Sequence, residues 1–260
     1  MIVACLQLGY PDGESPADRV DRVVLEVEAG PPADLVVLPE LWDVGYFAFD
    51  DYRSWGSPLD SGPLRPLSGV ARARGVVLVA GSVLERDGSR LHNTVPVIGP
   101  DGDLLGSYRK RHLFAYASRE QELLSPGDAS VVVDTALGRL GIATCFDLRF
   151  PEQFAEMRAW GADLLVVPAA WPAARLEHWD VLTRARAIET QTPIAACNGI
   201  GDCHGVDLAG SSRIVDARGG CTVAPDAPGW VVADIDPEDA IRYRTEFPLR
   251  EPFIDPKESS

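Results

Sequence analysis

Three residues of the chain are of the types needed to attack a carbonyl carbon, and each lies at the end of a predicted strand. Glu40 ends "VVLPE", Lys110 ends "LLGSYRK" and Cys145 ends "RLGIATC". A thiol, a carboxylate and an ammonium group supply the nucleophile, the base and the cation of covalent acyl transfer. In α/β proteins such side chains gather at the carboxyl ends of strands. The pattern therefore predicts one catalytic site built from three distant segments.

Each of these groups has a predicted task. A free thiol has a pKa of about 8.5, so little of it is thiolate at neutral pH, and we expect Glu40 to take the proton of Cys145 as attack proceeds. The oxyanion of the tetrahedral intermediate then needs hydrogen-bond donors. We expect Lys110 and the backbone N–H of Phe146 to supply them, each donor being worth roughly 3–4 kcal/mol.

Lys110 is also singled out by composition. Of the 24 basic residues only Lys110 and Lys257 are lysines, and Lys110 lies among arginines in "SYRKRHLF". A lysine in that position offers a compact ammonium group whose pKa can be tuned, which a guanidinium cannot provide.

The sequence lacks the residues that two other kinds of site would need. A Cys–His–Asn protease needs a histidine in a suitable context, and a phosphate site needs a glycine-rich loop between strand and helix; the sequence offers neither. The spacing of Cys197, Cys203 and His204 matches no standard zinc pattern, so no metal site is predicted. The histidines considered are His92, His112, His178 and His204.

Hydrophobic periodicity predicts the elements that position these residues. Strands are expected at 2–8, 33–39, 76–85, 162–168 and 193–199, with hairpins at 92–110 and 130–145 and further β segments at 211–220 and 229–236. Helices are expected at 15–30, 63–75, 151–161 and 175–191.

The sequence of one predicted strand occurs twice in the chain. "ADLVVLPELW" at 33–42 returns as "ADLLVVPAAW" at 162–171, with a glutamate after the proline only in the first copy. Two related halves, each forming a sheet covered by helices, would pack face to face. We therefore predict an α/β fold, a four-layer α-β-β-α sandwich with an internal pseudo-two-fold repeat. No linker divides the halves, so residues 1–260 are expected to form a single domain.

Composition limits the partners. The net charge of -15 argues against nucleic acid or an anionic membrane, because both need a basic surface. No apolar run approaches the ~20 residues that span a bilayer, and the start of the chain has no basic signal region. Five widely spread cysteines are typical of reduced thiols, so a cytoplasmic protein is expected.

Several motifs resemble those of one known family. "LPELW", "YRKRHLF" and "GIATCFDLRFPE", in that order, resemble signatures of the nitrilase superfamily of carbon–nitrogen hydrolases. Further similar segments are "SPGD" at 125–128, "PAAW" at 168–171 and "HWDVLTRARAIETQ" at 178–191. The resemblance covers residues 2 to 236, nearly the whole chain.

The resemblance implies the same sandwich, a Glu–Lys–Cys triad, no metal or organic cofactor, and at least a homodimer, with the tail 237–260 at the subunit interface. Carried over, Cys145 is the nucleophile, Glu40 the general base and Lys110 the cation. The family has a second glutamate between the lysine and cysteine motifs. Counting back from "SPGD" places it at Glu120, and Glu122 is the competing choice.

Within the superfamily, "HLF" and "CFDLRFPE" resemble the amidase branches that include omega-amidase and deaminated-glutathione amidase. Arg149 then either holds a carboxylate of the substrate or forms an ion pair with Asp147 or Glu152. Aromatic side chains are expected to wall the pocket, and small residues after the second proline to leave space in it. These residues are Tyr46, Phe47 and Trp171, and Ala169 and Ala170.

The expected reaction is hydrolysis of the primary amide of a small compound through a thioester, with release of ammonia. The alternatives within the fold are N-carbamoyl hydrolysis and nitrile hydrolysis, and those of other classes are a thioester-dependent acyltransferase and a silent scaffold. The segment "AYASRE" and the tail "FPLREPFIDP" depart from the family's usual pattern, which leaves the substrate open.

Overall fold

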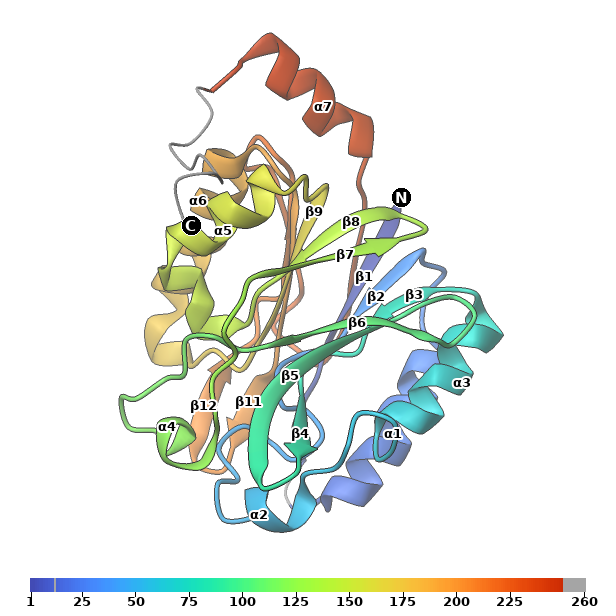
Figure 1. Ribbon diagram of the computed structural model, residues 1–260, viewed down its shortest axis with the longest axis vertical. Coiled ribbons are helices and arrows are strands. Elements are labelled where there is room, and N and C mark those ends of the chain that lie inside the picture. The colour runs from blue at the N-terminus through green and yellow to red at the C-terminus, as the bar shows by residue number, and fades with distance from the viewer. Residues whose placement is uncertain (12, 250–260) are drawn as a thin grey trace.

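In the computed structural model, two β-sheets face each other and helices cover both outer sides (Figure 1). The structure describes residues 1–11 and 13–249. Helices α1 and α3 lie on one outer side of the sandwich, and α5 and α6 lie on the other. The predicted four-layer architecture is confirmed.

The elements have the following bounds. The first sheet contains β1 (Ile2–Gln7), β2 (Leu35–Val37), β3 (Val77–Val79), β4 (Val83–Asp87), β5 (Arg90–Ile98), β6 (Leu104–Arg109) and β15 (Gly229–Asp234). The second contains β7 (Val131–Thr135), β8 (Gly138–Ile142), β9 (Leu164–Ala169), β10 (Ile194–Asn198), β13 (Arg213–Val215) and β14 (Cys221–Val223). A separate hairpin pairs β11 (Ile200–Cys203) with β12 (Val206–Ala209). The helices are α1 (Pro16–Glu28), α2 (Tyr52–Trp55), α3 (Leu64–Arg74), α4 (Glu120–Leu123), α5 (Pro151–Ala159), α6 (Leu176–Thr190) and α7 (Pro237–Glu246), with 3-10 helices η1 (Cys145–Arg149) and η2 (Ala173–Arg175).

The repeated sequence forms equivalent strands. β2 lies between β1 and β3, and β9 lies between β8 and β10, each within three parallel strands. The two copies are thus the middle strands of corresponding units, and both end at the same side of the sandwich, where the backbone N–H of Glu40 donates to the carbonyl of Ala169 at 3.2 Å.

Apolar side chains fill three layers. Val37 and Val166 belong to the core between the two sheets. On the outer side of the first sheet, Val23 of α1 is buried with the side chains of α3. On the second sheet, Phe154 of α5 and Trp179 of α6 are buried. Burial of these faces is the main term that stabilises the sandwich.

Local signals set the helix ends. The side chain of Ser15 accepts a hydrogen bond from the backbone N–H of Asp18 at 3.2 Å and caps α1, with Pro16 at the first position. α3 ends at Gly75, whose φ of +64° is readily adopted by glycine. The helices predicted at these places are confirmed.

The single strand predicted at 76–85 is wrong, because the chain breaks between β3 and β4. Gly81 has φ +64°, and a Cβ at this position would lie 2.1 Å from the carbonyl oxygen of Pro39. The next residue, Ser82, donates its N–H to the Pro39 carbonyl at 3.0 Å and accepts at Oγ from the N–H of Leu41 at 2.9 Å. The break lets this segment support the turn that carries Glu40.

The expectation of one sheet for each half is wrong for β15. This late strand pairs antiparallel with β1, from Ile2 opposite Asp234 to Gln7 opposite Gly229. It covers an edge of the first sheet that would otherwise be open to pairing with other chains. The hairpin β11–β12 and helix α7 were also not predicted from periodicity.

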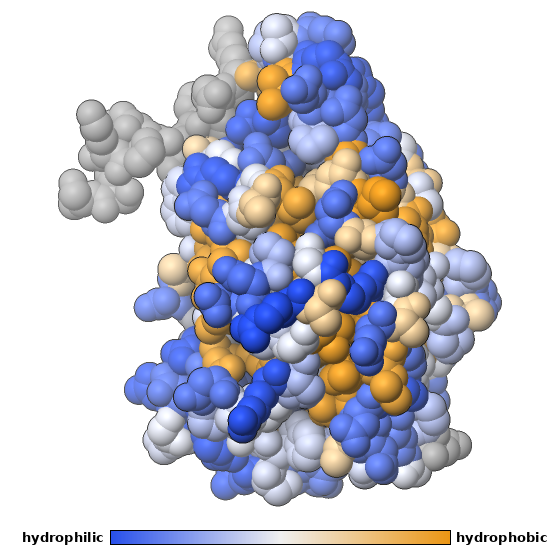
Figure 2. Space-filling model, turned by 90° about the vertical axis from the view of Figure 1, so that its right-hand side faces the viewer, coloured by the Kyte–Doolittle hydropathy of each residue, from blue (hydrophilic) through white to orange (hydrophobic). Residues whose placement is uncertain are grey.

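Helix α7 stands at the upper end of the molecule in Figures 1 and 2. The face turned to the viewer in Figure 2 exposes hydrophobic side chains among hydrophilic ones.

Of the predicted tail 237–260, residues 250–260 lie outside the described residues. No helix among the described residues is long and apolar enough to cross a membrane.

Candidate active site

Glu40 lies in the turn that follows β2, and its side chain is fully buried. The turn is tight: Leu41 has φ +42°, and its N–H is held by Ser82. Oε2 of Glu40 accepts a hydrogen bond from the backbone N–H of Ala170 at 2.9 Å. The carboxylate therefore reaches across the gap between the two sheets.

Lys110 follows β6 and is also buried. Its backbone N–H donates to the carbonyl of Asn93 on the neighbouring strand β5 at 2.8 Å, which fixes the strand end. Its Nζ lies 2.8 Å from Oε1 of Glu40, and 2.9 Å and 3.0 Å from the two oxygens of Glu120. One ammonium group thus bridges two carboxylates, which compensates for the loss of water around all three charges.

Glu120 begins α4 and is the second buried glutamate of the cluster. Its Oε2 accepts hydrogen bonds from the N–H of Phe114 at 2.6 Å and the hydroxyl of Tyr46 at 3.1 Å. The competing choice, Glu122, is exposed and pairs with Arg119. The structure therefore brings Glu120, and not Glu122, to Glu40 and Lys110.

Asn93 joins the same cluster and was missed in the sequence. Its Nδ2 donates to Oε1 of Glu40 at 2.8 Å and to Oε1 of Glu120 at 3.0 Å. A neutral donor between the two carboxylates reduces their repulsion and fixes their separation. The available signal was a polar residue in the otherwise apolar strand "HNTVPVI".

Cys145 opens η1, after the two residues Ala143 and Thr144 that follow β8, and has a φ of +45° that side-chain-bearing residues rarely adopt. Asp147 holds this bend, because its Oδ2 accepts from the N–H of Thr144 at 2.8 Å and from the hydroxyl of Tyr108 at 2.7 Å. Its Oδ1 lies 2.7 Å from Nδ1 of His112. The bend turns the thiol out of the sheet, and Cys145 stays 8% exposed.

The electrostatics favour a protonated thiol beside a base. Burial raises the pKa of the Cys145 thiol well above its ordinary value, and the charge of Glu40 raises it further. Burial also raises the pKa of the Glu40 carboxyl, against the charge of Lys110. For Lys110, burial lowers the pKa, but the charges of Glu120 and Glu40 outweigh it, so the net pKa lies well above the ordinary value.

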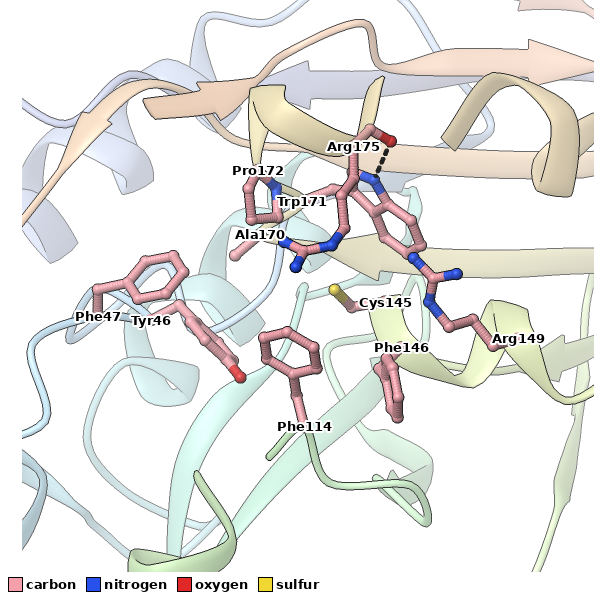
Figure 3. Close-up of a pocket in the computed structure, with 10 residues that line it drawn as sticks. All are labelled: Tyr46, Phe47, Phe114, Cys145, Phe146, Arg149, Ala170, Trp171, Pro172 and Arg175. Atoms are coloured by element: carbon pink, nitrogen blue, oxygen red, sulfur yellow. Dashed lines mark hydrogen bonds between the residues drawn. The ribbon is translucent and has the colours of Figure 1, made fainter. Parts of the chain in front are cut away.

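The thiol opens into a pocket with an apolar wall. Figure 3 shows the sulfur of Cys145 directed into the space between the surrounding side chains. The lining residues are Tyr46, Phe47, Phe114, Cys145, Phe146, Arg149, Ala170, Trp171, Pro172 and Arg175.

The predicted pocket residues are thus brought together, with one exception. Ala169 does not line the pocket: its side chain is in the core between the second sheet and its helices. Its carbonyl instead accepts from the N–H groups of Glu40 and Gly199, both at 3.2 Å. It is the last residue of β9, where side chains alternate between faces, so Ala169 and Ala170 cannot both face the pocket.

The ion pair considered for Arg149 is not formed with Asp147 or Glu152. The guanidinium lies over the rings of Trp171 and Phe146 instead, 5.1 Å and 5.8 Å from their centroids, and lies 3.1 Å from Nδ1 of His178. Asp147 is occupied by the hydrogen bonds that hold the Cys145 bend. Within residues 1–11 and 13–249, no group of three or more His, Cys, Asp or Glu side chains is arranged to hold a metal ion.

The comparison with known families decides among the possible assignments of this cluster. The family model "Carbon-nitrogen hydrolase" matches residues 2–245. The chain belongs to the carbon–nitrogen hydrolase family. The predicted superfamily is confirmed, and the buried Glu40, Lys110 and Cys145 fit the family's triad.

Two curated relatives and one solved structure describe this carbon–nitrogen hydrolase further. It is 36% identical over 256 residues to "2-oxoglutaramate amidase" of Paenarthrobacter nicotinovorans, covering 95% of this chain and 87% of the relative. It is 34% identical over 256 residues to "2-oxoglutaramate amidase" of Bacillus subtilis, covering 95% of each chain. Its fold matches crystalline Saccharomyces cerevisiae Nit3, a member of branch 10 of the nitrilase superfamily, with a TM-score of 0.87, 30% identity and coverage of 97% and 96%.

These similarities confirm three predictions: the fold class, the amidase-type branch, and an amidase as the class of enzyme. They leave the individual roles of the cluster's residues to be proposed from the geometry.

Proposed function

We propose that this amidase hydrolyses the terminal amide of a small carboxylate-bearing compound, and that 2-oxoglutaramate is a substrate. The observation that carries the proposal is the buried cluster of Glu40, Lys110 and Glu120 beside the thiol of Cys145, at a pocket with arginines in its wall. The names of the two curated relatives support the substrate. The apolar wall fits the short carbon chain between the amide and the carboxylate.

In the first half-reaction the Glu40 carboxylate accepts the proton of the Cys145 thiol as Sγ attacks the amide carbon. The Lys110 ammonium and the N–H of Phe146 stabilise the oxyanion. The carbon–nitrogen bond then breaks, and Glu40 returns the proton to the nitrogen, assisted by Lys110. Ammonia leaves, and the acyl group remains on Cys145 as a thioester.

In the second half-reaction a water molecule donates a proton to Glu40 and attacks the thioester carbon. The carbon–sulfur bond breaks, the acid is released, and the proton passes from Glu40 back to sulfur. Glu120 takes no proton in this scheme. It holds Lys110 at a fixed position and keeps it charged.

A panel assay tests the proposed reaction. Purified protein is incubated with small omega-amides including 2-oxoglutaramate, with N-carbamoyl amino acids and with nitriles, and ammonia is measured. We expect the omega-amides to be hydrolysed fastest. Faster hydrolysis of carbamoyl compounds or nitriles would overturn the proposal in favour of one of those reactions, and transfer to an added amine in preference to water would indicate an acyltransferase.

We also propose a homodimer formed through the outer face of α6. Val181 and Ile188 are exposed by 55% and 43%, and they lie seven residues apart, on one side of the helix. Sedimentation of the wild-type protein and a Val181→Glu/Ile188→Glu variant tests this. A dimer that the variant converts to monomers is expected, and a monomeric wild type or an unchanged dimer in the variant would contradict it.

A cytoplasmic location remains part of the proposal. The five cysteines are all free thiols, which is typical of a reducing compartment. Cell fractionation with an antibody tests it, with the protein expected in the cytoplasmic fraction.

A further inference from the structure

Two arginines face the same pocket without a counterion. Arg149 is the last residue of η1, which begins at Cys145, and Arg175 is the last residue of η2, directly before α6. Among the residues that the structure describes, neither guanidinium forms an ion pair with a carboxylate, whereas Arg19, Arg109 and Arg213 do. Two unpaired cations in one apolar pocket are costly unless an anion completes the site.

Arg175 is held in place by aromatic contacts. Its guanidinium lies 5.9 Å from the ring centroid of Phe114 and 5.0 Å from that of Tyr116. The backbone is fixed too, because the indole N–H of Trp171 donates to the carbonyl of Arg175 at 2.7 Å, as Figure 3 shows. A cation stacked on aromatic rings keeps its hydrogen-bond donors free for a ligand.

The charges of the two arginines also affect each other. Burial and then the like charge of Arg175 lower the pKa of Arg149. In Figure 3 the guanidinium of Arg175 points into the space above Tyr46 and Phe114, while that of Arg149 lies against Trp171. Of the two, Arg175 therefore has its donors more open to the pocket, whereas Arg149 is engaged with His178.

We propose that Arg175, assisted by Arg149, binds the carboxylate at the far end of the substrate and so selects anionic omega-amides over neutral amides. This inference rests on the proposed amidase function and adds a specificity-determining residue to it. The carboxylate is distant from the reacting bond, so Arg175 contributes equally to binding of substrate and transition state. Its loss is therefore expected mainly in KM.

The test uses two amides that differ at one end. Glutaramate carries a carboxylate where pentanamide carries a methyl group, and both present the same primary amide. In Arg175→Gln we expect kcat/KM for glutaramate to fall about 10- to 100-fold, mostly through KM, with pentanamide hydrolysis unchanged. Arg175→Lys should recover part of the loss, and Arg65→Gln, at an exposed arginine of α3, is the matched control.

Each other outcome is informative. An equal loss on both amides would make Arg175 a structural residue, and no loss on glutaramate would remove it from recognition; either result overturns the inference. Binding of glutarate to Cys145→Ala, with and without Arg175→Gln, is measured by calorimetry and does not require turnover. If the wild type cleaves no amide but Arg175→Gln abolishes glutarate binding, the proposed function fails while the anion site stands. If glutarate binds equally to both proteins, the anion site fails.

Discussion

The N–H of Ala170 donates a hydrogen bond of 2.9 Å to the carboxylate of Glu40, so the two copies of the repeated strand meet at the catalytic centre. Glu40 follows the proline of the first copy, and Ala170 follows that of the second by two residues. The first copy supplies the carboxylate. The second supplies a backbone donor that orients it and a small side chain that leaves room for the substrate.

Glu40→Gln tests the role of the base. The amide has nearly the same shape and can still accept from Ala170, but it cannot take a proton from Cys145. We expect kcat/KM to fall by about 10²- to 10⁴-fold. Steady-state ammonia release measures it, and activity within a few-fold of wild type would exclude Glu40 as the general base.

Glu120→Gln and Glu122→Gln separate the two candidates for the second glutamate. Lys110, Asn93, Tyr46 and Phe114 all donate to Glu120, so a glutamine nitrogen there would face donors. We expect at least about a 10-fold loss of kcat for Glu120→Gln. Glu122→Gln is the matched control, expected to be wild-type in activity; the reverse pattern would contradict the assignment.

Lys110→Arg tests the need for a compact ammonium group. The site around Nζ is fully buried and is shaped by three short contacts, which a planar guanidinium cannot reproduce. We expect at least about a 100-fold loss of kcat. Lys257→Arg, at the only other lysine, is the control, and near-normal turnover of Lys110→Arg would remove Lys110 from the mechanism.

Sequence patterns predicted Glu40 and Cys145 because each ends an apolar run, and Lys110 because it is a lysine among arginines at the end of a predicted hairpin strand. Asn93 was missed because it lies inside a strand, where no boundary marks it. Arg175 was missed for a related reason: it stands at the start of a predicted helix, where a basic residue usually faces solvent. Its place in the pocket depends on the indole of Trp171 and on rings from the distant 114–116 segment.

The pairing between strands that are distant in the chain could not be predicted from the sequence either. β15 joins β1 across more than two hundred residues, and its sequence, "GWVVAD", predicts a strand but not its neighbour. The break at Gly81 depends on the approach of the Pro39 carbonyl, which only the assembled sheet creates. The periodicity of apolar side chains identifies individual helices and strands. Strand register, the strands at sheet edges and the residues that lie between elements are determined by contacts that form only when the elements pack together.

Asp43 gives a prediction for stability against pH. It is buried, and burial raises the pKa of its carboxyl from 3.8 to about 6, while the hydrogen bond from Trp55 acts in the opposite direction. Because the folded pKa is higher than the unfolded one, the protonated form stabilises the fold below pH 3.8, and this contribution is lost as the pH rises through 6. The change amounts to about 3 kcal/mol.

Asp43→Asn should remove that part of the pH dependence. The free energy of unfolding is measured by urea denaturation between pH 4 and 7 for both proteins. We expect the stability of the wild type to decline relative to that of Asp43→Asn as the pH rises. Asp21→Asn, at an exposed aspartate, is the control and should keep the wild-type slope. Parallel curves for wild type and Asp43→Asn would show that Asp43 does not titrate in this range.

The central claim is that the acyl group of the substrate forms a thioester with Cys145. The most direct test is mass spectrometry of protein that is quenched with acid during turnover of glutaramate. The account predicts a peptide containing Cys145 that is heavier by the mass of glutaramate less that of ammonia, absent in Cys145→Ala, which should lose at least about 10⁴-fold in kcat. An adduct on another residue, or full turnover by Cys145→Ala, would contradict the account.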